Sequence, residues 1–464
     1  MKNSLLRKID LDQMLSKNQK VQLPKTLSAF DLIFLGIGAI IGTGIFILPG
    51  TVAALHAGPG IIFSFIIAAI VCAFAAMCYS EFSSAIPVTG SAYTYSYIVF
   101  GELIAWLIGW TLLLEYGLAT AAVSTGWSAY FVSLLEGLGI NFPTALSGAY
   151  NAEAGTFINL PAVLMVFAIA ALLSIGTRES ARLNKIIVFL KVGVILLFIV
   201  VGVFYVEPSN WTPMLPYGFS GVLTGAALVF FAYLGFDAVS AAAEEVKNPQ
   251  RNMPIGIIGS LLVCTVLYVV VSLVLTGIVP YTDLNVSDPV SYALQLVNQD
   301  WAAGIISLGA IIGMTTVILV MMYGGTRLVY AFGRDGLLPN SMTEIHPKTK
   351  TPLKNTWTFA IVIAVIAGAV PLDQLASLVN MGTLIAFTVV SIGIIPLRRN
   401  KKLQSNSSFK VPFYPVVPII SFVLCIFLIF QLEAETFIYC GIWFIIGVVI
   451  YFAYGRKHSK LNEK

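Results

Sequence analysis

The sequence predicts an all-α integral membrane protein with about twelve membrane spans, in which two five-span repeats of opposite orientation precede two further helices. Three observations predict this class. Hydrophobic residues make up 58% of the chain and charged residues 10%, whereas charged residues make up roughly a quarter of a soluble domain. Apolar runs long enough to cross about 30 Å of hydrocarbon recur along the whole chain. Lys and Arg residues gather in alternate connections between these runs.

The apolar runs define the expected spans and divide the chain. They lie near residues 30–55, 60–82, 102–131, 157–176, 184–206, 219–242, 254–279, 302–331, 356–370, 374–396, 412–431 and 436–455. The expected regions are an N-terminal segment (1–29), a first repeat (30–206), a second repeat (219–396), two accessory spans (412–455) and a tail (456–464). The connections are too short for a soluble domain, so function must lie in the bundle or its loops.

Positive charge gives the expected orientation. Of the 26 Lys and Arg residues, all but Lys191 fall in segments or at span ends that share one side of the membrane. Cytoplasmic loops carry such an excess, so both termini are expected in the cytoplasm of a multi-pass protein of the cell membrane. The N-terminus lacks a short apolar region followed by a cleavage site, so no cleaved signal peptide is expected. The net charge of +4 is therefore attributed to orientation beside anionic lipid, and no nucleic-acid partner is expected.

Glycines interrupt the first and sixth spans. The first contains Gly36, Gly38 and Gly42-Thr43-Gly44, and the sixth contains Gly235 shortly before Asp237. Glycine weakens a helix by roughly 1 kcal/mol relative to alanine, so these positions indicate helices that unwind at mid-membrane. Interrupted spans at matching places in two halves are typical of a transporter binding site. The alternative is close helix packing at small residues. A dinucleotide-binding loop is excluded because no strand surrounds the glycines.

An unwound pair of spans offers both kinds of backbone group. The outer half of the first span would present N–H groups to a carboxylate, and free carbonyl groups near both breaks would accept hydrogen bonds from an ammonium group. The expected carboxylate-binding residues are Gly42, Thr43 and Gly44, and the expected amine-binding residues are Ile40, Ile41, Phe231, Ala232 and Leu234. This set predicts a site for a free L-amino acid, with Phe231 as a lid and Met321 lining the side-chain space, although ordinary packing also explains a single Phe or Met.

Three ionisable residues are expected in span interiors: Glu115, Lys191 and Asp237. Such residues are candidate functional groups because burying a charge in a bilayer is costly. A buried Lys beside two acids would load and release a proton, which predicts proton coupling. The alternatives are that Lys191 reaches the cytoplasmic headgroups, and that Glu115 and Asp237 form a structural pair with Lys191 or with helix ends.

Other function classes are disfavoured by what the chain contains. The five cysteines fall within spans and the three histidines are scattered, so neither a metal site nor a nucleophile with a base is expected. The chain has no phosphate-binding loop for ATP and no repeated pore motif. No cofactor and no enzymatic activity are therefore expected.

Four motifs together resemble the amino acid/polyamine/organocation superfamily, and within it the bacterial branch of the cationic amino acid transporters. They span Gly38–Phe46, Gly235–Asp237, Glu244–Arg251 and Gly333–Pro339. The resemblance implies a LeuT-like fold with alternating access and the same carboxylate and amine sites. It also implies that Lys191 occupies the region where sodium-driven relatives bind an ion, which favours proton coupling.

The resemblance leaves the substrate open. The segments Phe413–Pro415 and Gly441–Phe444 resemble branched-chain permeases of Gram-positive bacteria. We therefore expect proton-coupled uptake of small or branched neutral amino acids such as isoleucine, leucine, valine, methionine, alanine and threonine. A carrier of arginine or lysine becomes the expectation if Glu115 faces the pocket, and an exchanger of the same fold is a further alternative. Affinity, oligomeric state and any small membrane subunit are not predicted.

Overall fold

A computed structural model describes residues 7–8, 25–86, 91–175, 181–237, 239, 245–347, 349, 351–400 and 409–463. Within these ranges the chain is helical and forms no strand, only isolated bridges. The prediction of an all-α protein is confirmed. Part of the predicted motif 244–251 and nine of the basic residues used for the orientation lie outside the described residues.

Seven helical stretches of the described residues are long and apolar enough to cross a membrane. They are Leu48–Ala85 (from α4 through α5, Ile61–Ala85), Glu102–Gly137 (α7), Lys185–Tyr205 (most of α9, Ala181–Gly202, and the turn after it), Pro249–Ile278 (α12), Asp300–Arg334 (α14), Leu372–Arg399 (α16) and Ala434–His458 (from α19, Ala434–Ile450, through α20). Shorter apolar helices are Ala29–Ile40 (α2), Leu160–Ile175 (α8), Gly218–Tyr233 (α10 and the turn after it), Leu353–Ala369 (α15) and Val416–Ile429 (α18). Each predicted apolar run overlaps one of these helices. The first run, 30–55, covers Ala29–Ile40 and also extends into Leu48–Ala85, and residues 238 and 240–242 of the sixth run lie outside the described residues.

Two further α-helices of eight or more described residues were not predicted. They are α6 (Ser91–Val99), at the end of the bundle that carries both termini, and α13 (Pro289–Leu296), at the opposite end. Both lie in connections rather than in apolar runs, so hydropathy gave no signal for them.

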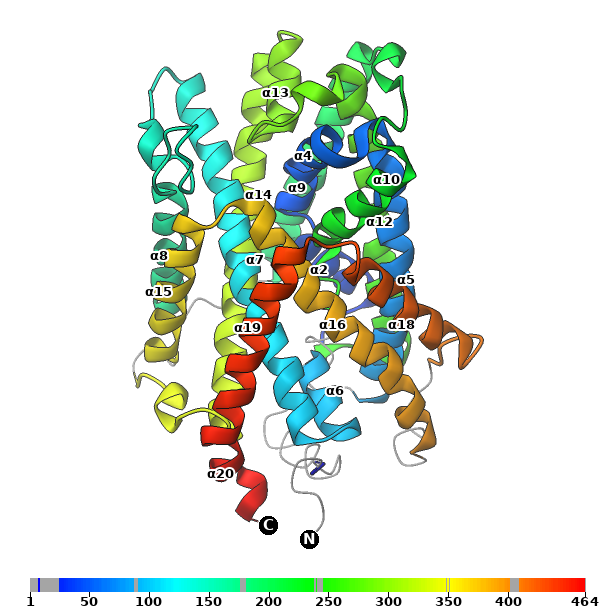
Figure 1. Cartoon of the computed structure of the whole chain (residues 1–464), viewed down its shortest axis with the longest axis vertical. Coiled ribbons are helices and arrows are strands. Elements are labelled where there is room, and N and C mark those ends of the chain that lie inside the picture. Colours follow the sequence, from blue (N-terminus) through cyan, green and yellow to red (C-terminus); the bar gives the residue numbers. More distant parts are fainter. Residues whose placement is uncertain are drawn as a thin grey trace.

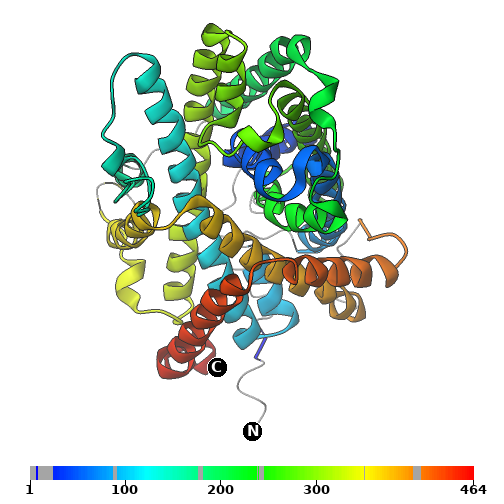
Figure 2. The ribbon, with the colours of Figure 1, turned by 45° about the horizontal axis from the view of Figure 1, so that its top comes forward.

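The helices form one bundle around α7 and α14, which pack along each other (Figure 1). α12 packs against α2 and α5, and α16 packs against α7 and α18. α8 and α15 pack together on one side, while α18 and α19 run along another (Figure 2). This arrangement places α2 and α10 inside the bundle, with their interrupted ends near its centre.

Each of these two helices ends abruptly. Ser28 caps α2 and forms reciprocal hydrogen bonds with Asp31, and the helix ends at Ile40, before Gly42 at φ −150° and ψ −140°. The chain becomes helical again in α3 (Thr43–Phe46) and α4 (Leu48–Val52). α10 (Gly218–Val229) ends in a 3₁₀ turn over Phe230–Tyr233. Both interruptions predicted from the glycines are therefore present.

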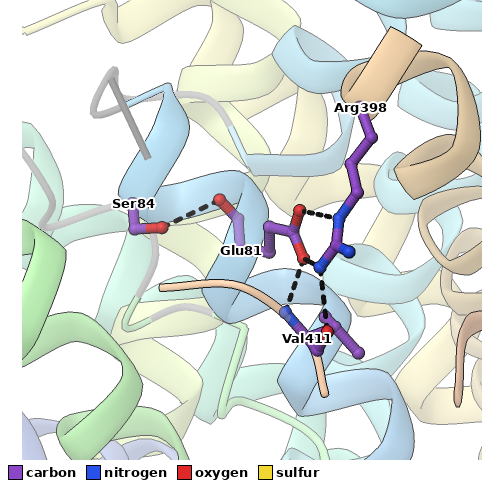
Figure 3. A network of polar contacts seen from close by, with 4 residues as sticks. All are labelled: Glu81, Ser84, Arg398 and Val411. Carbon is purple, nitrogen blue, oxygen red and sulfur yellow. Dashed lines mark hydrogen bonds and ion pairs between the residues drawn. The ribbon is translucent and has the colours of Figure 1, made fainter. Parts of the chain in front are cut away.

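Two buried carboxylates that the sequence analysis did not identify tie together the end of the bundle that carries the termini. Glu81 of α5 accepts two hydrogen bonds of 2.7 Å from the Arg398 guanidinium and one of 2.7 Å from the Val411 N–H (Figure 3). Glu102 of α7 accepts from Tyr451 at 3.0 Å and from Ser459 at 2.6 Å. The statement that three ionisable residues lie within spans is thus incomplete. Glu81 and Glu102 stand at span ends, where the sequence alone does not distinguish a buried carboxylate from a solvated one.

Candidate substrate site

The two interrupted helices contact each other at the positions where each one breaks. A Cβ atom built on Gly44 of α3 would overlap the Cα of Ala232, so only glycine permits this approach. Gly235 has φ +106°, which favours glycine, and a Cβ there would lie 2.9 Å from the Ala39 carbonyl carbon. The glycines therefore have both of the roles considered in the sequence analysis. They stand where the helices unwind, and they allow the two breaks to pack closely.

A small cavity of about 20 Å³ lies where the breaks meet. Its lining residues are Ala39, Ile40, Gly42, Thr43, Gly44, Ala119, Val123, Phe231, Leu234, Val317 and Met321. Seven of the predicted site residues are among them: Ile40, Gly42, Thr43, Gly44, Phe231, Leu234 and Met321. Two others, Ile41 and Ala232, do not line the cavity.

Side chains from α7 and α14 form the apolar wall of the cavity. Ala119 and Val123 project from α7, and Val317 and Met321 from α14, each pair four residues apart and so on one helix face. Of these four, the sequence analysis named Met321 alone. Among the described residues that line the cavity there is no charged side chain, and Thr43 alone carries a hydroxyl group, which donates to the Met314 sulfur at 3.4 Å.

Several of the expected backbone acceptors already accept hydrogen bonds. The Tyr268 hydroxyl of α12 donates to the Ala232 carbonyl at 2.7 Å and approaches the Ile40 carbonyl at 3.2 Å. It thereby joins the two broken helices. Tyr268 was not predicted, because one tyrosine within an apolar run carries no local signal of such a role. The Thr43 and Gly44 N–H groups stand at the first turn of α3, where a helix has no internal acceptors for them.

Lys191 of α9 is fully buried and lies at the broken end of α2. Its ammonium group donates to the Gly38 carbonyl at 2.8 Å and to the Ile41 carbonyl at 3.0 Å. The alternative in which Lys191 reaches the lipid headgroups is contradicted by these contacts. A cation at this position also interacts favourably with the C-terminal end of the helix dipole.

Glu115 of α7 and Asp237 are also buried but do not line the cavity. Their carboxyl groups lie close enough to interact electrostatically, and Glu115 contacts the Thr383 side chain of α16. One Glu115 carboxyl oxygen has no hydrogen-bond partner among the described residues. Glu115 and Asp237 therefore lie near each other outside the cavity lining. Lys191 lies at the first break, where it contacts the end of α2.

Comparison with known proteins identifies the family. The family model for amino acid permeases matches residues 27–455. The chain belongs to the amino acid permease family. It is 56% identical to a methylthioribose transporter of Bacillus subtilis over 461 residues, which cover 99% of this chain and 100% of that protein. It is 53% identical to the branched-chain amino acid permease BcaP of Bacillus subtilis over the full length of both chains (467 aligned residues). It is 40% identical to BcaP of Lactococcus lactis over 465 residues, 98% of this chain and 99% of that one.

Membership confirms the superfamily inferred from the motifs. The relatives are permeases and transporters rather than enzymes, as expected. Together with the long apolar helices, membership in the amino acid permease family makes this chain a multi-pass membrane transporter. The relatives differ in the substrates that their names state, so the substrate of this permease has to be argued from its own site.

Proposed function

We propose that this permease takes up small or branched neutral L-amino acids across the plasma membrane, with both termini in the cytoplasm, and that uptake is coupled to protons. The observation that carries the proposal is the cavity between the two broken helices. Its backbone supplies hydrogen-bonding groups that suit a carboxylate and an amine, while its described side chains are uncharged and, apart from Thr43, apolar.

The proposed architecture is that of twelve spans in two inverted repeats, 30–206 and 219–396. The seven long and five shorter apolar helices support this count. The breaks after α2 and α10 fall at corresponding places in the two proposed repeats, which is the arrangement expected for a site at a repeat interface.

The lining argues against a cationic substrate. A bound arginine or lysine side chain would need an acidic partner, because an unpaired charge in an apolar cavity is strongly disfavoured. Glu115 is the acid that would have supported such a carrier, and it does not line the cavity. Ala119, Val123 and Val317 instead offer a surface for an aliphatic side chain.

The cavity is too small for its proposed substrate in this conformation. A volume of about 20 Å³ is near the space that one water molecule needs, so an amino acid can enter only after the walls separate. The walls can separate if α3 moves away from the turn at Phe230–Tyr233, or if α7 or α14 moves away from the two breaks. This supports alternating access, in which one conformation is closed around the site.

For Lys191 we propose the role of proton carrier. When protonated, its ammonium group joins α9 to the end of α2 through the Gly38 and Ile41 carbonyls. A charge buried here is stabilised only while those two carbonyl groups remain in place. Loss of the proton therefore weakens the contact between α9 and α2, and movement of α2 away from Lys191 in turn favours loss of the proton. Glu115 and Asp237 are proposed to assist by exchanging that proton.

Uptake into proteoliposomes tests the proposal. Labelled isoleucine should accumulate when the outside is acidic, and unlabelled valine and leucine should compete while arginine should not. Competition mainly by arginine would favour the cationic alternative. Uptake that needs amino acid or amine preloaded inside, with no response to a pH gradient, would favour an exchanger.

Methylthioribose is the second candidate substrate because the relative that is 56% identical is a transporter of that compound. It is a sugar, whose hydroxyl groups need several polar partners, and the lining supplies one side-chain hydroxyl, that of Thr43. The site therefore favours the amino acid. Unlabelled methylthioribose in the same assay decides the question: competition stronger than that of valine would assign the sugar.

A further inference from the structure

A second and larger cavity lies away from the substrate site, between α7, α14, α15 and α19. Its volume is about 260 Å³ and its walls are apolar. Leu113 and Leu118 of α7, Val362 and Ile366 of α15, and Trp443 of α19 belong to its lining. In Figure 1, α15 stands on one side of this region, and α19 crosses in front of α7. Val362 is 53% exposed, so this side of the cavity faces the surroundings of the bundle.

The size and polarity of the cavity fit a hydrocarbon chain. An apolar cavity of about 150 Å³ binds benzene, so one of about 260 Å³ accommodates a longer apolar group. Because the helices around the cavity face a bilayer, the hydrocarbon available to fill it is the acyl chain of a lipid.

Among the described lining residues, two side chains are polar, Asn355 and Thr358. Asn355, in the first turn of α15, lines the cavity and is 2% exposed. Its amide nitrogen donates to the Thr326 carbonyl of α14 at 2.7 Å, which fixes the other atom as an oxygen acceptor. That oxygen has no hydrogen-bond partner among the described residues. A buried acceptor of this kind calls for a donor, such as a hydroxyl group.

A basic residue directly precedes Asn355 in the sequence. Lys354 is exposed and lies one turn before Thr358, another lining residue, on the same face of α15. α15 begins toward the end of the bundle that carries both termini. Basic residues beside a cavity between membrane helices attract anionic lipid headgroups.

We propose that this cavity binds one anionic phospholipid whose headgroup carries hydroxyl groups, of the phosphatidylglycerol type. One acyl chain fills the apolar cavity, a headgroup hydroxyl donates to the Asn355 carbonyl oxygen, and the phosphate lies beside Lys354. Lipid binding in this cavity does not depend on which substrate the permease carries.

Native mass spectrometry of the purified, delipidated full-length protein tests the proposal. Phosphatidylglycerol and phosphatidylethanolamine with identical chains serve as probes. The wild-type protein should bind one phosphatidylglycerol at least about fivefold more tightly than phosphatidylethanolamine. Val362→Trp fills the cavity and should remove this binding step. Ile361→Trp, at a neighbouring position that is 54% exposed and outside the lining, should leave it unchanged.

Charge variants test the headgroup contact separately. Lys354→Glu should abolish the preference for phosphatidylglycerol and leave phosphatidylethanolamine binding unchanged. Lys410→Glu, at an exposed residue before α18, is the matched control and should keep the preference. Melting temperatures of all variants show whether each is folded.

Other results would overturn the proposal. Equal binding of the two lipids by the wild-type protein would remove the headgroup assignment. Equal losses in Val362→Trp and Ile361→Trp would indicate unspecific lipid around the bundle. If the wild-type protein is a dimer that Val362→Trp converts to monomers, the occupant is a second copy of the chain. Should Val362→Trp fail to fold, quenching of Trp443 fluorescence by phosphatidylglycerol with brominated chains provides the same test on the wild-type protein, with Trp443→Phe as the blank, and absence of quenching counts against the site.

Discussion

The ammonium group of Lys191 supplies donors to the end of α2, where the helix has none of its own. We predict that Lys191→Ala still binds isoleucine but that its uptake no longer responds to a pH gradient, because the group that gains and loses the proton is gone. Uptake into proteoliposomes with and without an inward proton gradient measures this.

Lys185→Ala is the matched control for that experiment. Lys185 stands six residues earlier on α9, is 43% exposed and forms an ion pair with Asp31. It should keep its response to the gradient. A full response in Lys191→Ala, or an equal loss in both variants, would contradict the proposed proton carrier.

Asp288, in the loop before α13, links that loop to α7. Its carboxyl group accepts a hydrogen bond of 2.5 Å from Ser133. Burial, with a smaller contribution from the charge of Glu136, raises its pKa from 3.8 to about 6, against the opposing effect of the Ser133 hydrogen bond. The folded protein therefore holds this proton at pH values where the unfolded chain has released it.

This difference predicts how stability depends on pH. The contribution of Asp288 to the free energy of unfolding is fully present below about pH 4 and is lost as the pH rises to about 6, a change of about 3 kcal/mol. In Asp288→Asn the side chain cannot ionise, so the melting temperature should fall less between pH 4 and pH 7 than in the wild-type protein. Asp283→Asn, at an exposed residue of the same loop, should match the wild-type profile.

At the scale of elements, the contact between α3 and the turn at Phe230–Tyr233 depends on Gly44. We predict that Gly44→Ala destabilises the protein by about 1–3 kcal/mol and reduces isoleucine uptake at least tenfold, because a Cβ would force the two breaks apart. The measurements are the melting temperature and the initial rate of uptake.

Gly304→Ala is the matched control, because a Cβ at Gly304 of α14 meets nothing within 4 Å. It should retain transport and gain up to about 1 kcal/mol of stability from better helix propensity. Normal transport by Gly44→Ala would show that the contact between the breaks is not required.

The ion pair between Glu81 and Arg398 joins α5, α16 and the segment before α18 (Figure 3). Arg398→Ala leaves the buried Glu81 carboxylate without its charge partner, so we predict a loss of about 3–5 kcal/mol in stability. Arg399→Ala, at the exposed neighbouring residue, should change stability by less than about 0.5 kcal/mol. Thermal unfolding in detergent compares the two, and equal melting temperatures would contradict this role.

Sequence patterns predicted the helices and their breaks better than they predicted the side-chain contacts between distant segments. Gly42 and Gly44 indicated where the first helix breaks, because a backbone preference is local. Tyr268 and Arg398 gave no such indication, since their partners lie 36 and 317 residues away and only the fold brings them together. For the same reason Arg398 was interpreted as an orientation determinant alone.

For the whole molecule, the orientation is testable because all five cysteines are buried. We predict that Ala154→Cys, in the exposed segment before α8, reacts with a membrane-impermeant maleimide in intact cells. Asn340→Cys, after α14, should react only after the cells are permeabilised. The reverse pattern would place the termini outside the cell.

The bundle as a whole could be predicted because the bilayer imposes lengths and charge asymmetries on a sequence. The residues that form the walls of the substrate cavity could not be predicted from the sequence. Ala119, Val123 and Val317 are ordinary residues of long apolar helices, and their four-residue spacing recurs on every face of such helices. Only the packing of α7 and α14 against the broken pair distinguishes the face that meets substrate.

The position of Lys191 has one more consequence. A metal ion that joined the end of α2 to α9 would have a dissociation constant, and dilution would remove it. The Lys191 ammonium is attached to the chain by covalent bonds and contacts α2 directly. In a cell whose surroundings contain almost no salt, this joint would therefore persist, because it depends on the proton concentration and not on the concentration of a metal ion.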